Sequence, residues 1–476
     1  MTPGIFNDGA FEFIRAFLIG VEWFFTAYLV CYSTFLFISV IIGSAALYQK
    51  RQQEIFKNVL LKDHFIPISI IVPARNEEVT VTETVRSLLA LEYPLFEIIV
   101  VDDGSVDGTA ARLIETFGMQ AIRRPVQRKV PCRPAEEIYE ANAHGVLLTL
   151  IRKKNGGKAD ALNLGINACR YPYFICMDAD SVLQYDSLSR IVKPVLEDEN
   201  IVAVGGTVRP ANNVTLEGGR VSRYRLPRNP LACMQVLEYA RSFLASRILF
   251  DKFNGSLIIS GAFGLFKKDA VVAVGGYDAA TVGEDMELVV KLHDYCISNG
   301  LPYRMRYATD AICWSQVPEH LKDLCRQRRR WHLGLFQSMW KHRVMLGNPK
   351  FGAVSFISCF YYLFYELLSP FIEIFGIAAA VLAALAGLLD LPFMLLFFCA
   401  YAGFASVLTM TAFFARTQTI DLKIDPADAL KAAVLSVAEL TVLRFVLVWV
   451  RATAFIGYRK KKLRWDKTER KKIDLK

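Results

Sequence analysis

The stretch Tyr-Phe-Ile-Cys-Met-Asp-Ala-Asp-Ser at residues 173–181 joins an apolar run to two carboxylates, those of Asp178 and Asp180. The apolar run has the character of a buried strand, and open parallel sheets bind ligands at the carboxyl ends of their strands. Residues two apart in an extended segment share a face, so a following turn can direct both carboxylates at one ion. Hard divalent cations such as Mg²⁺ or Mn²⁺ prefer oxygen ligands and complete their shell with phosphates and water. The stretch therefore predicts a metal-bound nucleotide diphosphate, although an isolated Asp-x-Asp is more often a solvated acidic turn.

Strand and helix patterns alternate on both sides of this stretch. An apolar run, typical of a parallel strand covered on both faces, occupies residues 66–72, and further strands are predicted at 96–101, 147–151 and 201–208. Helical spacing connects them, for example at Val81, Val85 and Leu88. This order predicts an α/β domain. Residues 220–249 are predicted to be largely helical, and residues 123–143 fit neither pattern.

Apolar segments flank the predicted α/β domain. Residues 23–48 are 26 residues without a charged side chain, long enough to cross a bilayer core of ~30 Å. Lys50 and Arg51 follow this run, which predicts that the next domain is cytoplasmic. Residues 351–458 are again mostly apolar, and a basic tail follows them. The same rule requires an even number of crossings between the domain and the tail, so two or four fit and three do not.

The amino-acid composition excludes several classes of protein. The 476 residues are 53% hydrophobic, which is too apolar for a purely soluble chain. The net charge is +10, but residues 458–476 hold ten Lys or Arg and three Asp or Glu, so the remainder is nearly balanced. That balance argues against a nucleic-acid partner. The ten cysteines form no Cys-x-x-Cys pair, which predicts a reduced compartment without a zinc site or a disulfide framework.

Five charged features follow one another along the chain: Asp102-Asp103 after a strand, Lys158 after two glycines, Asp178-x-Asp180, Glu284-Asp285 at a helix start, and Gln327-x-x-Arg330-Trp331. In this order, between membrane segments, they resemble the inverting, membrane-embedded family 2 glycosyltransferases. These are the synthases of cellulose, hyaluronan, chitin and poly-N-acetylglucosamine. The resemblance covers residues 66–331 by motif and the flanking helices by architecture. It implies an α/β GT-A-type (Rossmann-like) catalytic domain joined to an α-helical transmembrane domain.

The resemblance divides the chain into six parts. They are an interfacial segment (1–22), a transmembrane helix (23–48), a cytoplasmic GT-A domain (62–320), an amphipathic interface helix with the Gln-x-x-Arg-Trp motif (321–346), C-terminal transmembrane or interfacial helices (351–458) and a basic cytoplasmic tail (459–476). Such a protein is expected to cross the cell membrane several times, with its catalytic domain in the cytoplasm.

The resemblance implies a site for a UDP-sugar donor. Asp102 or Asp103 is expected to accept the uracil N–H. The segment Pro73-Ala74-Arg75-Asn76-Glu77 is expected to cover the same base, with Glu77 near the ribose. Lys158 is expected to approach the uridine or the diphosphate. The alternatives are a helix or turn cap for the two acids and an exposed side chain for the lysine.

Catalysis is expected to use Asp180 as the ligand of Mg²⁺ or Mn²⁺, with Asp178 sharing the ion or contacting the ribose. The ion would neutralise the departing diphosphate. Asp285 is the candidate general base, because a carboxylate near the acceptor hydroxyl can take its proton as the new bond forms. Direct attack opposite the nucleotide inverts the anomeric carbon. Glu284 is expected to be a structural partner at the helix start, and Gly283 stands where relatives often have Thr.

Gln327, Arg330 and Trp331 are expected on one face of a helix, since residues three or four apart are neighbours. Arg330 is expected to hold a diphosphate oxygen. Trp331 is expected to stack on the acceptor sugar at the mouth of a channel through the membrane. The alternative is a basic interfacial helix whose arginines face lipid: Arg326, Arg328 and Arg329.

Two further sets of residues concern the acceptor. The segment Ser260-Gly261-Ala262 matches the part of the relatives that lines the acceptor site. Ionisable groups in apolar surroundings are costly and tend to be functional. The apolar C-terminal region carries several such groups, which line a polymer channel or pair between helices: Glu366, Glu373, Glu439 and Arg444.

The function expected from the resemblance is processive transfer of UDP-N-acetylglucosamine or UDP-glucose onto a growing β-linked polysaccharide, with translocation of the polymer. One alternative is a non-processive lipid glycosyltransferase similar to ceramide glucosyltransferase. The alternative of another class is a catalytically decayed binding or transport protein. The expected partners are the UDP-sugar, the polysaccharide acceptor, the lipid bilayer and an export or regulatory subunit.

Overall fold

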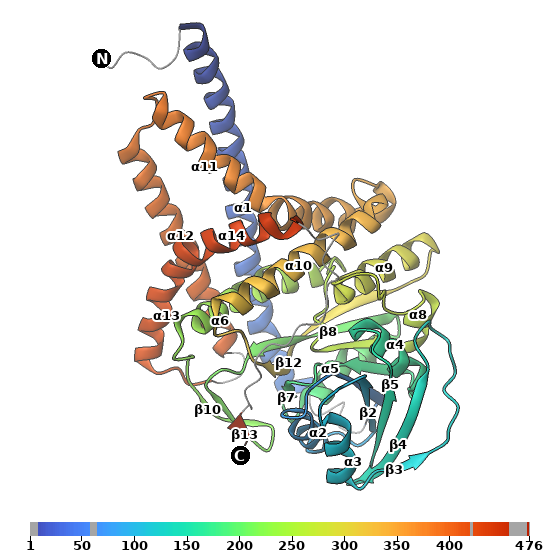
Figure 1. Cartoon of the computed structure of the whole chain (residues 1–476). Helices are drawn as coiled ribbons and strands as arrows, with labels where there is room; N and C mark the ends of the chain where they lie inside the picture. Colours follow the sequence, from blue (N-terminus) through green and yellow to red (C-terminus); the bar gives the residue numbers. More distant parts are fainter. Residues whose placement is uncertain (1–7, 58–63, 419–421, 457–473, 476) are drawn as a thin grey trace.

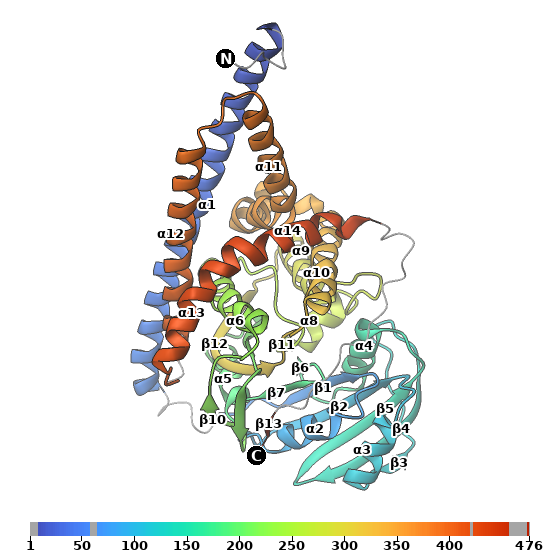
Figure 2. The same ribbon diagram turned by 60° about the vertical axis from the view of Figure 1, so that its left-hand side comes forward.

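The computed structural model describes residues 8–57, 64–418, 422–456 and 474–475. An α/β domain lies at one end of the molecule. Three helices extend away from it in Figure 1: α1 (Asp8–Lys57), α11 (Ser369–Leu385) and α12 (Leu391–Gln418). Figure 2 shows α1 and α12 side by side over much of their length.

Within the described residues, ten strands form the main sheet in the order β3-β4-β5-β2-β1-β6-β11-β8-β12-β7. Strands β5, β2, β1 and β6 are parallel neighbours, and so are β8 and β12, whereas β11 runs antiparallel to β6 and β8. The sheet is therefore mixed. Its strands are β1 (Ile68–Ala74), β2 (Phe96–Asp103), β3 (Gln120–Ile122), β4 (Ala135–Ala143), β5 (Val146–Lys153), β6 (Tyr173–Cys176), β7 (Ser181–Leu183), β8 (Ile201–Pro210), β11 (Gly264–Lys267) and β12 (Arg304–Ser315).

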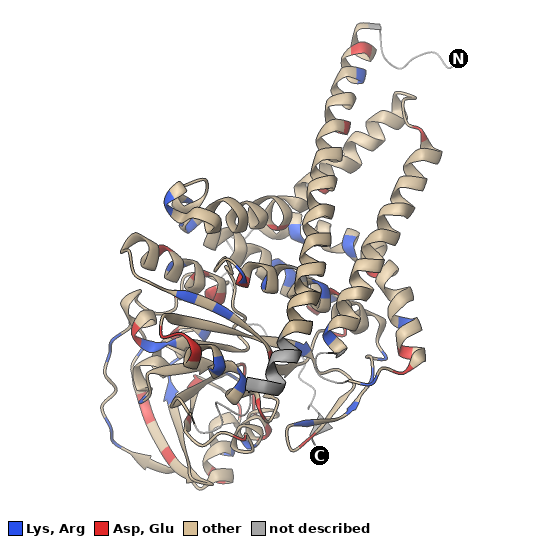
Figure 3. Ribbon diagram, turned by 180° about the vertical axis from the view of Figure 1, so that it is seen from behind, with Lys and Arg blue, Asp and Glu red and all other residues tan. Residues whose placement is uncertain are grey.

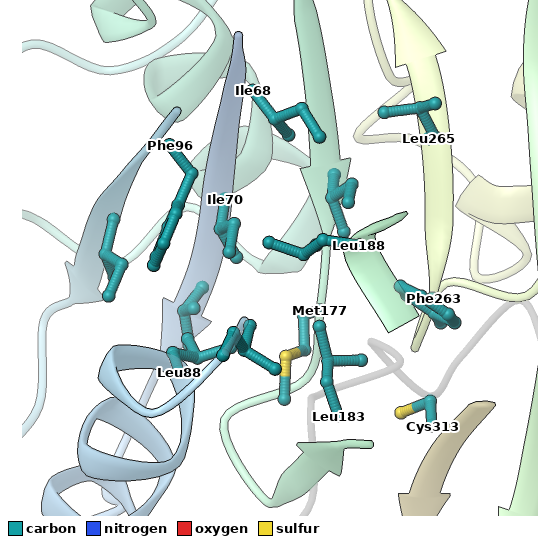
Figure 4. Close-up of a cluster of buried hydrophobic side chains, with 14 of the residues drawn as sticks. Ile68, Ile70, Leu88, Phe96, Met177, Leu183, Leu188, Phe263, Leu265 and Cys313 are labelled. Atoms are coloured by element: carbon teal, nitrogen blue, oxygen red, sulfur yellow. The ribbon is translucent and has the colours of Figure 1, made fainter. Parts of the chain in front are cut away.

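Helices cover both faces of this sheet, as the apolar strands predict. One face packs against α2 (Val81–Leu89), α3 (Thr109–Phe117) and α5 (Ser187–Glu197). The other face packs against α4 (Lys158–Ala168), α8 (Lys268–Ala273) and α9 (Glu284–Ser298). Figure 4 shows the first core, in which Leu88 and Leu188 from helices meet Ile70 from β1. The α/β prediction is confirmed.

A smaller sheet contradicts the start of one prediction, whose remainder, residues 230–249, is helical. Residues 220–249 are predicted to be largely helical, but Arg220–Tyr224 is strand β10, which pairs with β9 (Val214–Glu217). Gly218 and Gly219 both have positive φ between the two strands, the backbone that a two-residue hairpin turn requires. The helix α6 (Pro230–Ser242) begins only after Asn229, whose side chain caps it. Strand β13 (Asp474–Leu475) is the third strand of this sheet and runs parallel to β9.

The helix α1 runs through residues 22 and 23 without a break, so the predicted interfacial and transmembrane segments are parts of one helix. Three described helices are long and apolar enough to cross a membrane: Gly9–Gln49, Leu391–Thr417 and Pro426–Phe455. A fourth candidate is the pair Val354–Leu367 and Ser369–Leu385, bent by 49° at its break. Figure 3 shows long stretches of these helices with few charged residues. The predicted tail at 459–476 lies outside the described residues except for Asp474 and Leu475.

The ionisable residues in the apolar helices are paired. The sequence left open whether they line a channel or pair between helices, and the observed contacts are ion pairs between segments far apart in the chain. The closest guanidinium and carboxylate atoms are 2.7, 2.9 and 3.2 Å apart in Arg241–Glu439, Arg444–Glu373 and Arg451–Glu366.

Candidate active site

Asp178 and Asp180 lie in the turn between β6 and β7, at the carboxyl end of β6, as the sequence predicts. Both are partly exposed. The backbone N–H of Ser181 donates to the carbonyl of Asp178 at 3.1 Å, which closes the turn. The Thr84 hydroxyl of α2 donates to the carbonyl of Ala179 at 2.7 Å, which fixes the turn to the domain. The turn therefore presents both carboxylates on a rigid support.

Four separate segments converge on the side chain of Lys158, the first residue of α4. Its Nζ lies 2.6 Å from Asp178 Oδ1, 3.4 Å from Glu284 Oε1 and 3.5 Å from the carbonyl oxygen of Gly261. The backbone N–H of Gly261 donates to Asp285 Oδ2 at 3.2 Å. The structure thus brings together Lys158, Asp178, Gly261, Glu284 and Asp285, which span more than a hundred residues of sequence.

The charged groups in this cluster shift one another's pKa values. Only 18% of the Lys158 side chain is exposed. Burial alone would lower its pKa, but the carboxylates of Asp178 and Glu284 raise it well above the usual value for lysine. Burial and the neighbouring Asp285 raise the pKa of Glu284, against the effect of Lys158. The ammonium group is therefore charged at neutral pH and available to an anionic ligand.

Close packing of two glycines positions the helix that carries Glu284 and Asp285. A Cβ at Gly283 would lie 2.7 Å from the Cα of Gly334 in α10 (Leu321–Lys341), closer than such atoms approach. The start of α9 and the middle of α10 are therefore in backbone contact. This contact explains why Gly283 stands where the family that the sequence resembles often has Thr.

Helix α10 carries Gln327, Arg330 and Trp331, as predicted. Arg330 is exposed, and its charge acts to lower the pKa of the buried Glu284. Trp331 is 42% exposed, and its ring lies 6.5 Å from that of Tyr239. Gln327 Oε1 is buried without a hydrogen-bond partner. Arg330 thus acts on the acidic cluster through its charge, and both Arg330 and Trp331 are open to a ligand.

The prediction that Arg328 faces lipid is wrong. Its guanidinium is buried and donates to Glu238 Oε2 at 2.6 Å. It also lies 4.5 Å from the centre of the Trp331 ring. Arg328 therefore fixes α10 to α6 and packs against the indole ring of Trp331.

Asp103 shapes the loop that leads to Lys158. Its fully buried carboxylate accepts hydrogen bonds from Lys153 at 2.5 Å and Asn155 at 3.0 Å. It also accepts the backbone N–H groups of Gly156 and Gly157, each at 2.8 Å. The sequence predictions missed this role, because the partners lie some fifty residues away and leave no local pattern.

The predicted base-covering loop lies over the turn that begins at Asp102. Asp102 Oδ1 accepts the N–H of Ser105 at 2.9 Å, so this acid caps its own turn. The Ser105 hydroxyl accepts the N–H of Asn76 at 2.9 Å, which joins the two loops. Glu77 is buried and accepts the Thr80 hydroxyl at 2.7 Å. The turn-cap alternative thus fits Asp102, and its contact with uracil stays a prediction.

Two cationic or polar residues remain from the predicted site. Pro73 lies in the buried strand β1, and Arg75 follows its end with a buried Nε that has no hydrogen-bond partner. The Ser260 hydroxyl accepts the N–H of Ala262 at 3.4 Å, beside the Gly261 contact to Asp285. Ser260 thus lies next to the residue that contacts Asp285.

A divalent ion fits this site only when a bound ligand supplies part of its coordination shell. Among the described residues, no group of three or more His, Cys, Asp or Glu side chains could hold a metal. Asp178 and Asp180 are a pair of carboxylates on one turn. A Mg²⁺ or Mn²⁺ site with one or two carboxylates is completed by substrate phosphates and water. The donor set therefore fits a metal that arrives with a nucleotide diphosphate.

A mixed sheet with an acid pair at the carboxyl end of a central strand defines the GT-A class of glycosyltransferase folds. The sequence model described as "Glycosyltransferase like family 2" matches residues 66–334. This match covers more than half of the chain, and the chain belongs to that family.

Two curated relatives and one solved structure are similar to this chain. A poly-β-1,6-N-acetyl-D-glucosamine synthase of Staphylococcus aureus is 31% identical over 316 residues, which are 65% of each chain. The synthase of the same description from Staphylococcus epidermidis is 30% identical over 321 residues, 66% of this chain and 67% of its own. The chain thus spans about two thirds of the length of the curated relatives that it matches.

The solved structure is a mannosyltransferase of Pyrobaculum calidifontis in complex with GDP-mannose and Mn²⁺. It matches 80% of this chain and 98% of its own, with a TM-score of 0.50 and 20% sequence identity. At that identity the likeness concerns the fold alone.

Proposed function

We propose that this chain is a membrane-embedded, inverting glycosyltransferase that polymerises a β-linked polysaccharide from UDP-N-acetylglucosamine. The convergence of Lys158, Asp178 and Asp285 carries the proposal, because it sets a cation for a diphosphate beside a base for an acceptor. The names of the curated relatives favour N-acetylglucosamine over glucose as the transferred sugar. Processive addition and translocation of the polymer belong to the same proposal.

The diphosphate of the donor would bind between Lys158 and Arg330. Both are cationic, and charge-assisted hydrogen bonds to phosphate oxygens are among the strong ones. Asp180, with Asp178, would hold the Mg²⁺ or Mn²⁺ ion, which supplies charge neutralisation to the leaving diphosphate. Asp178 already lies 2.6 Å from Lys158, so donor binding redistributes an existing ion pair.

Asp285 would take the proton of the acceptor hydroxyl. The acceptor oxygen forms a bond to the anomeric carbon while the bond from that carbon to the diphosphate breaks on the opposite face. The proton passes to the Asp285 carboxylate, and the bonding electrons leave with the UDP. The Gly261 N–H, 3.2 Å from Asp285 Oδ2, orients that carboxylate. Trp331 would stack on the acceptor sugar, and Ser260 would border it.

The protein would lie in the cell membrane with the α/β domain in the cytoplasm. Helices α11 and α12 form a hairpin that points away from the α/β domain in Figures 1 and 2. We infer two crossings there, with α13 (Pro426–Ala438) and α14 (Arg444–Ala452) returning along the membrane face beside α10. Two crossings satisfy the even number that the basic tail requires.

A radiolabelled incorporation assay tests the proposal. Membranes that contain the protein are incubated with UDP-N-acetylglucosamine or UDP-glucose and Mg²⁺ or Mn²⁺, and the product is sized. We expect a high-molecular-weight product from UDP-N-acetylglucosamine. A small, solvent-extractable product would instead indicate a lipid glycosyltransferase, and no product from either donor would favour a decayed domain.

The variant Asp285→Asn separates catalysis from binding. The amide keeps an oxygen for the Gly261 N–H but cannot take a proton, so transfer should fall by roughly 10²–10⁴-fold, the usual contribution of a general base. Binding of UDP should be unchanged. Asp269→Asn, at an exposed position of α8, is the matched control and should transfer like the wild type. Wild-type transfer by Asp285→Asn would remove its role as the base.

A further inference from the structure

A cavity of about 30 Å³ lies at the end of α12, away from the acidic cluster. Strands β8 and β12, α6 and the last turn of α12 form its walls. Its lining includes Arg209, Tyr224, Tyr239, Trp314 and Arg416. A cavity of this size holds about two water molecules, or one group the size of a phosphoryl group.

Two arginines in this cavity have no counter-charge among the residues that the structure describes. Arg209 is 8% exposed and Arg416 is 6% exposed. Arg209 Nη2 donates to the carbonyl oxygen of Arg416 at 2.8 Å, and its Nε has no partner. The guanidinium of Arg416 lies 5.4 Å from the centre of the Phe243 ring. Among the described residues, no carboxylate lies within salt-bridge distance of either arginine.

A further hydrogen-bond donor of the cavity is also unpaired among the described residues. Trp314 is fully buried, and its indole N–H has no acceptor among the described residues. Trp314 and Arg209 are paired in register on adjacent strands, so their side chains share this end of the sheet. Burial and the nearby charge of Arg416 lower the pKa of Arg209 to about 9. The described residues that line the cavity therefore combine two cations and one neutral donor, with no carboxylate among them.

Neighbouring arginines in the same region are paired. Arg225 lies 2.5 Å from Asp425, and Arg241 lies 2.7 Å from Glu439. Buried charges in proteins are almost always paired or bound to a ligand, since an unpaired one is costly. Within the described part of the chain, Arg209 and Arg416 thus differ from the neighbouring arginines in having no counter-charge.

We propose that the cavity binds an oxyanion of the phosphate type, held by Arg209, Arg416 and the Trp314 indole. The anion belongs to a lipid headgroup or to a free phosphate, which offer the same chemistry. Arg416 lies about 38 Å along the axis of α12 from its first residue, at 1.5 Å per residue. A bilayer core is ~30 Å thick, so with α12 as a crossing Arg416 reaches the depth of the headgroups.

The site also contacts the proposed acceptor side. Tyr239 lines the cavity, and its ring lies 6.5 Å from that of Trp331 and 6.0 Å from that of Phe243. An occupied cavity would hold Tyr239, and through it the indole of Trp331, in one position. This step rests on the proposed function, whereas binding of the oxyanion does not.

The test compares the full chain with two variants that each remove one positive charge. Arg416→Gln removes it from the cavity, and Arg223→Gln removes it from an exposed position on the neighbouring strand β10. In one arm, Tm is measured in detergent with increasing inorganic phosphate against chloride of equal ionic strength. In the other arm, native mass spectrometry counts retained phosphatidylglycerol.

The proposal expects phosphate or lipid binding in the wild type and in Arg223→Gln, weakened at least about tenfold in Arg416→Gln, as for a lost charged hydrogen-bond donor. A Tm that rises with phosphate identifies the ligand as a free anion. Retained lipid without such a rise in Tm identifies it as a lipid headgroup. In chloride alone, Arg416→Gln should unfold at the same or a higher temperature, because it relieves the repulsion between the two arginines. Equal binding in all three proteins, or a lower Tm of Arg416→Gln in chloride without any loss of binding, would overturn the proposal. Neither the Tm nor the amount of retained lipid depends on glycosyl transfer. Failure of this proposal and failure of the proposed function can therefore be distinguished.

Discussion

Lys158 places a largely buried ammonium group against two carboxylates that come from distant parts of the chain. Asp178 lies 2.6 Å from its Nζ, and Glu284 lies 3.4 Å from it. The sequence alone left an exposed lysine as an alternative, because two glycines before a lysine are typical of flexible loops. The buried Asp103 removes that freedom by accepting hydrogen bonds from Gly156 and Gly157. Lys158 is therefore held where a diphosphate would need it.

The substitution Lys158→Met tests this position. The side chain keeps its length but loses the charge, so Asp178 and Glu284 lose their cation and a diphosphate loses a donor. We expect weaker UDP binding and a fall in transfer of about 10–10²-fold, since a hydrogen bond to a charged group contributes about 1.5–3 kcal/mol. UDP titration and labelled-sugar incorporation measure the two effects. Lys154→Met, whose side chain is 81% exposed, is the control and should change neither.

The contact between α9 and α10 is the element on which the geometry of the cluster depends. It joins the helix start that carries Glu284 and Asp285 to the helix that carries Arg330 and Trp331. Two features hold it, a backbone contact at Gly283 and Gly334 and a buried ion cluster around Glu287.

A methyl group at Gly334 should separate the two helices. A Cβ there would lie 2.7 Å from the Cα of Gly283 and 2.8 Å from its nitrogen, so the backbone must move. Gly334→Ala should cost about 1–3 kcal/mol of stability, as overpacking usually does. It should also reduce transfer more than UDP binding, because Arg330 and Trp331 shift against Asp285. Gly403→Ala, with no atom within 4 Å of the added Cβ, is the control, and equal effects of both changes would contradict the argument.

Glu287 makes the stability of the same contact depend on pH. Its side chain is fully buried and lies 2.7 Å from Lys341 and 3.3 Å from Lys291. Burial alone would raise the pKa of Glu287, but His342, Lys291 and Lys341 lower it from 4.5 to about 2. A depressed pKa stabilises the fold above the unfolded value of about 4.5, and this stabilisation is lost as pH falls toward 2.

Glu287→Gln should therefore lower the free energy of unfolding by about 3 kcal/mol at pH 7, from 1.36 kcal/mol per pKa unit. The difference from the wild type should shrink as the pH falls from about 4.5 toward 2. Denaturant unfolding of the detergent-solubilised protein at several pH values measures it. Glu115→Gln, at an exposed position of α3, should show no comparable loss. A difference that stays constant over this pH range would show that Glu287 acts through packing.

The elements that sequence predicted well are those with local signals. The apolar run before Asp178 becomes β6, and α9 begins at Glu284, as the acids at that position indicate. The failures depend on contacts between distant residues. Arg220–Tyr224 is a strand because β9 is available as its partner, and Arg328 is buried because Glu238 lies opposite on α6. Neither partner is visible in a window of neighbouring residues.

At the scale of the whole molecule, the end of α12 and the start of α13 both contact the α/β domain. At the end of α12, Arg209 of the domain donates to the carbonyl of Arg416 at 2.8 Å. Arg225 of the domain lies 2.5 Å from Asp425, and Lys431 donates to the carbonyl of Pro227 at 2.6 Å. Strand β13 pairs with β9, so the end of the chain returns to the same side. The turn between α11 and α12 lies far from the domain in Figures 1 and 2. These contacts favour an even number of crossings after the α/β domain.

Labelling of single introduced cysteines tests this topology. In intact cells, a membrane-impermeant maleimide should label Leu388→Cys, in the turn between α11 and α12, and should leave Lys423→Cys unlabelled until the cells are permeabilised. The unmodified protein, with its ten cysteines, gives the background for both. Both substituted positions lie on connections between helices, so neither change removes a core contact. Labelling of Lys423→Cys from outside would require an odd number of crossings. It would then place Asp425 and its partner Arg225 on opposite sides of the bilayer, which a 2.5 Å ion pair forbids.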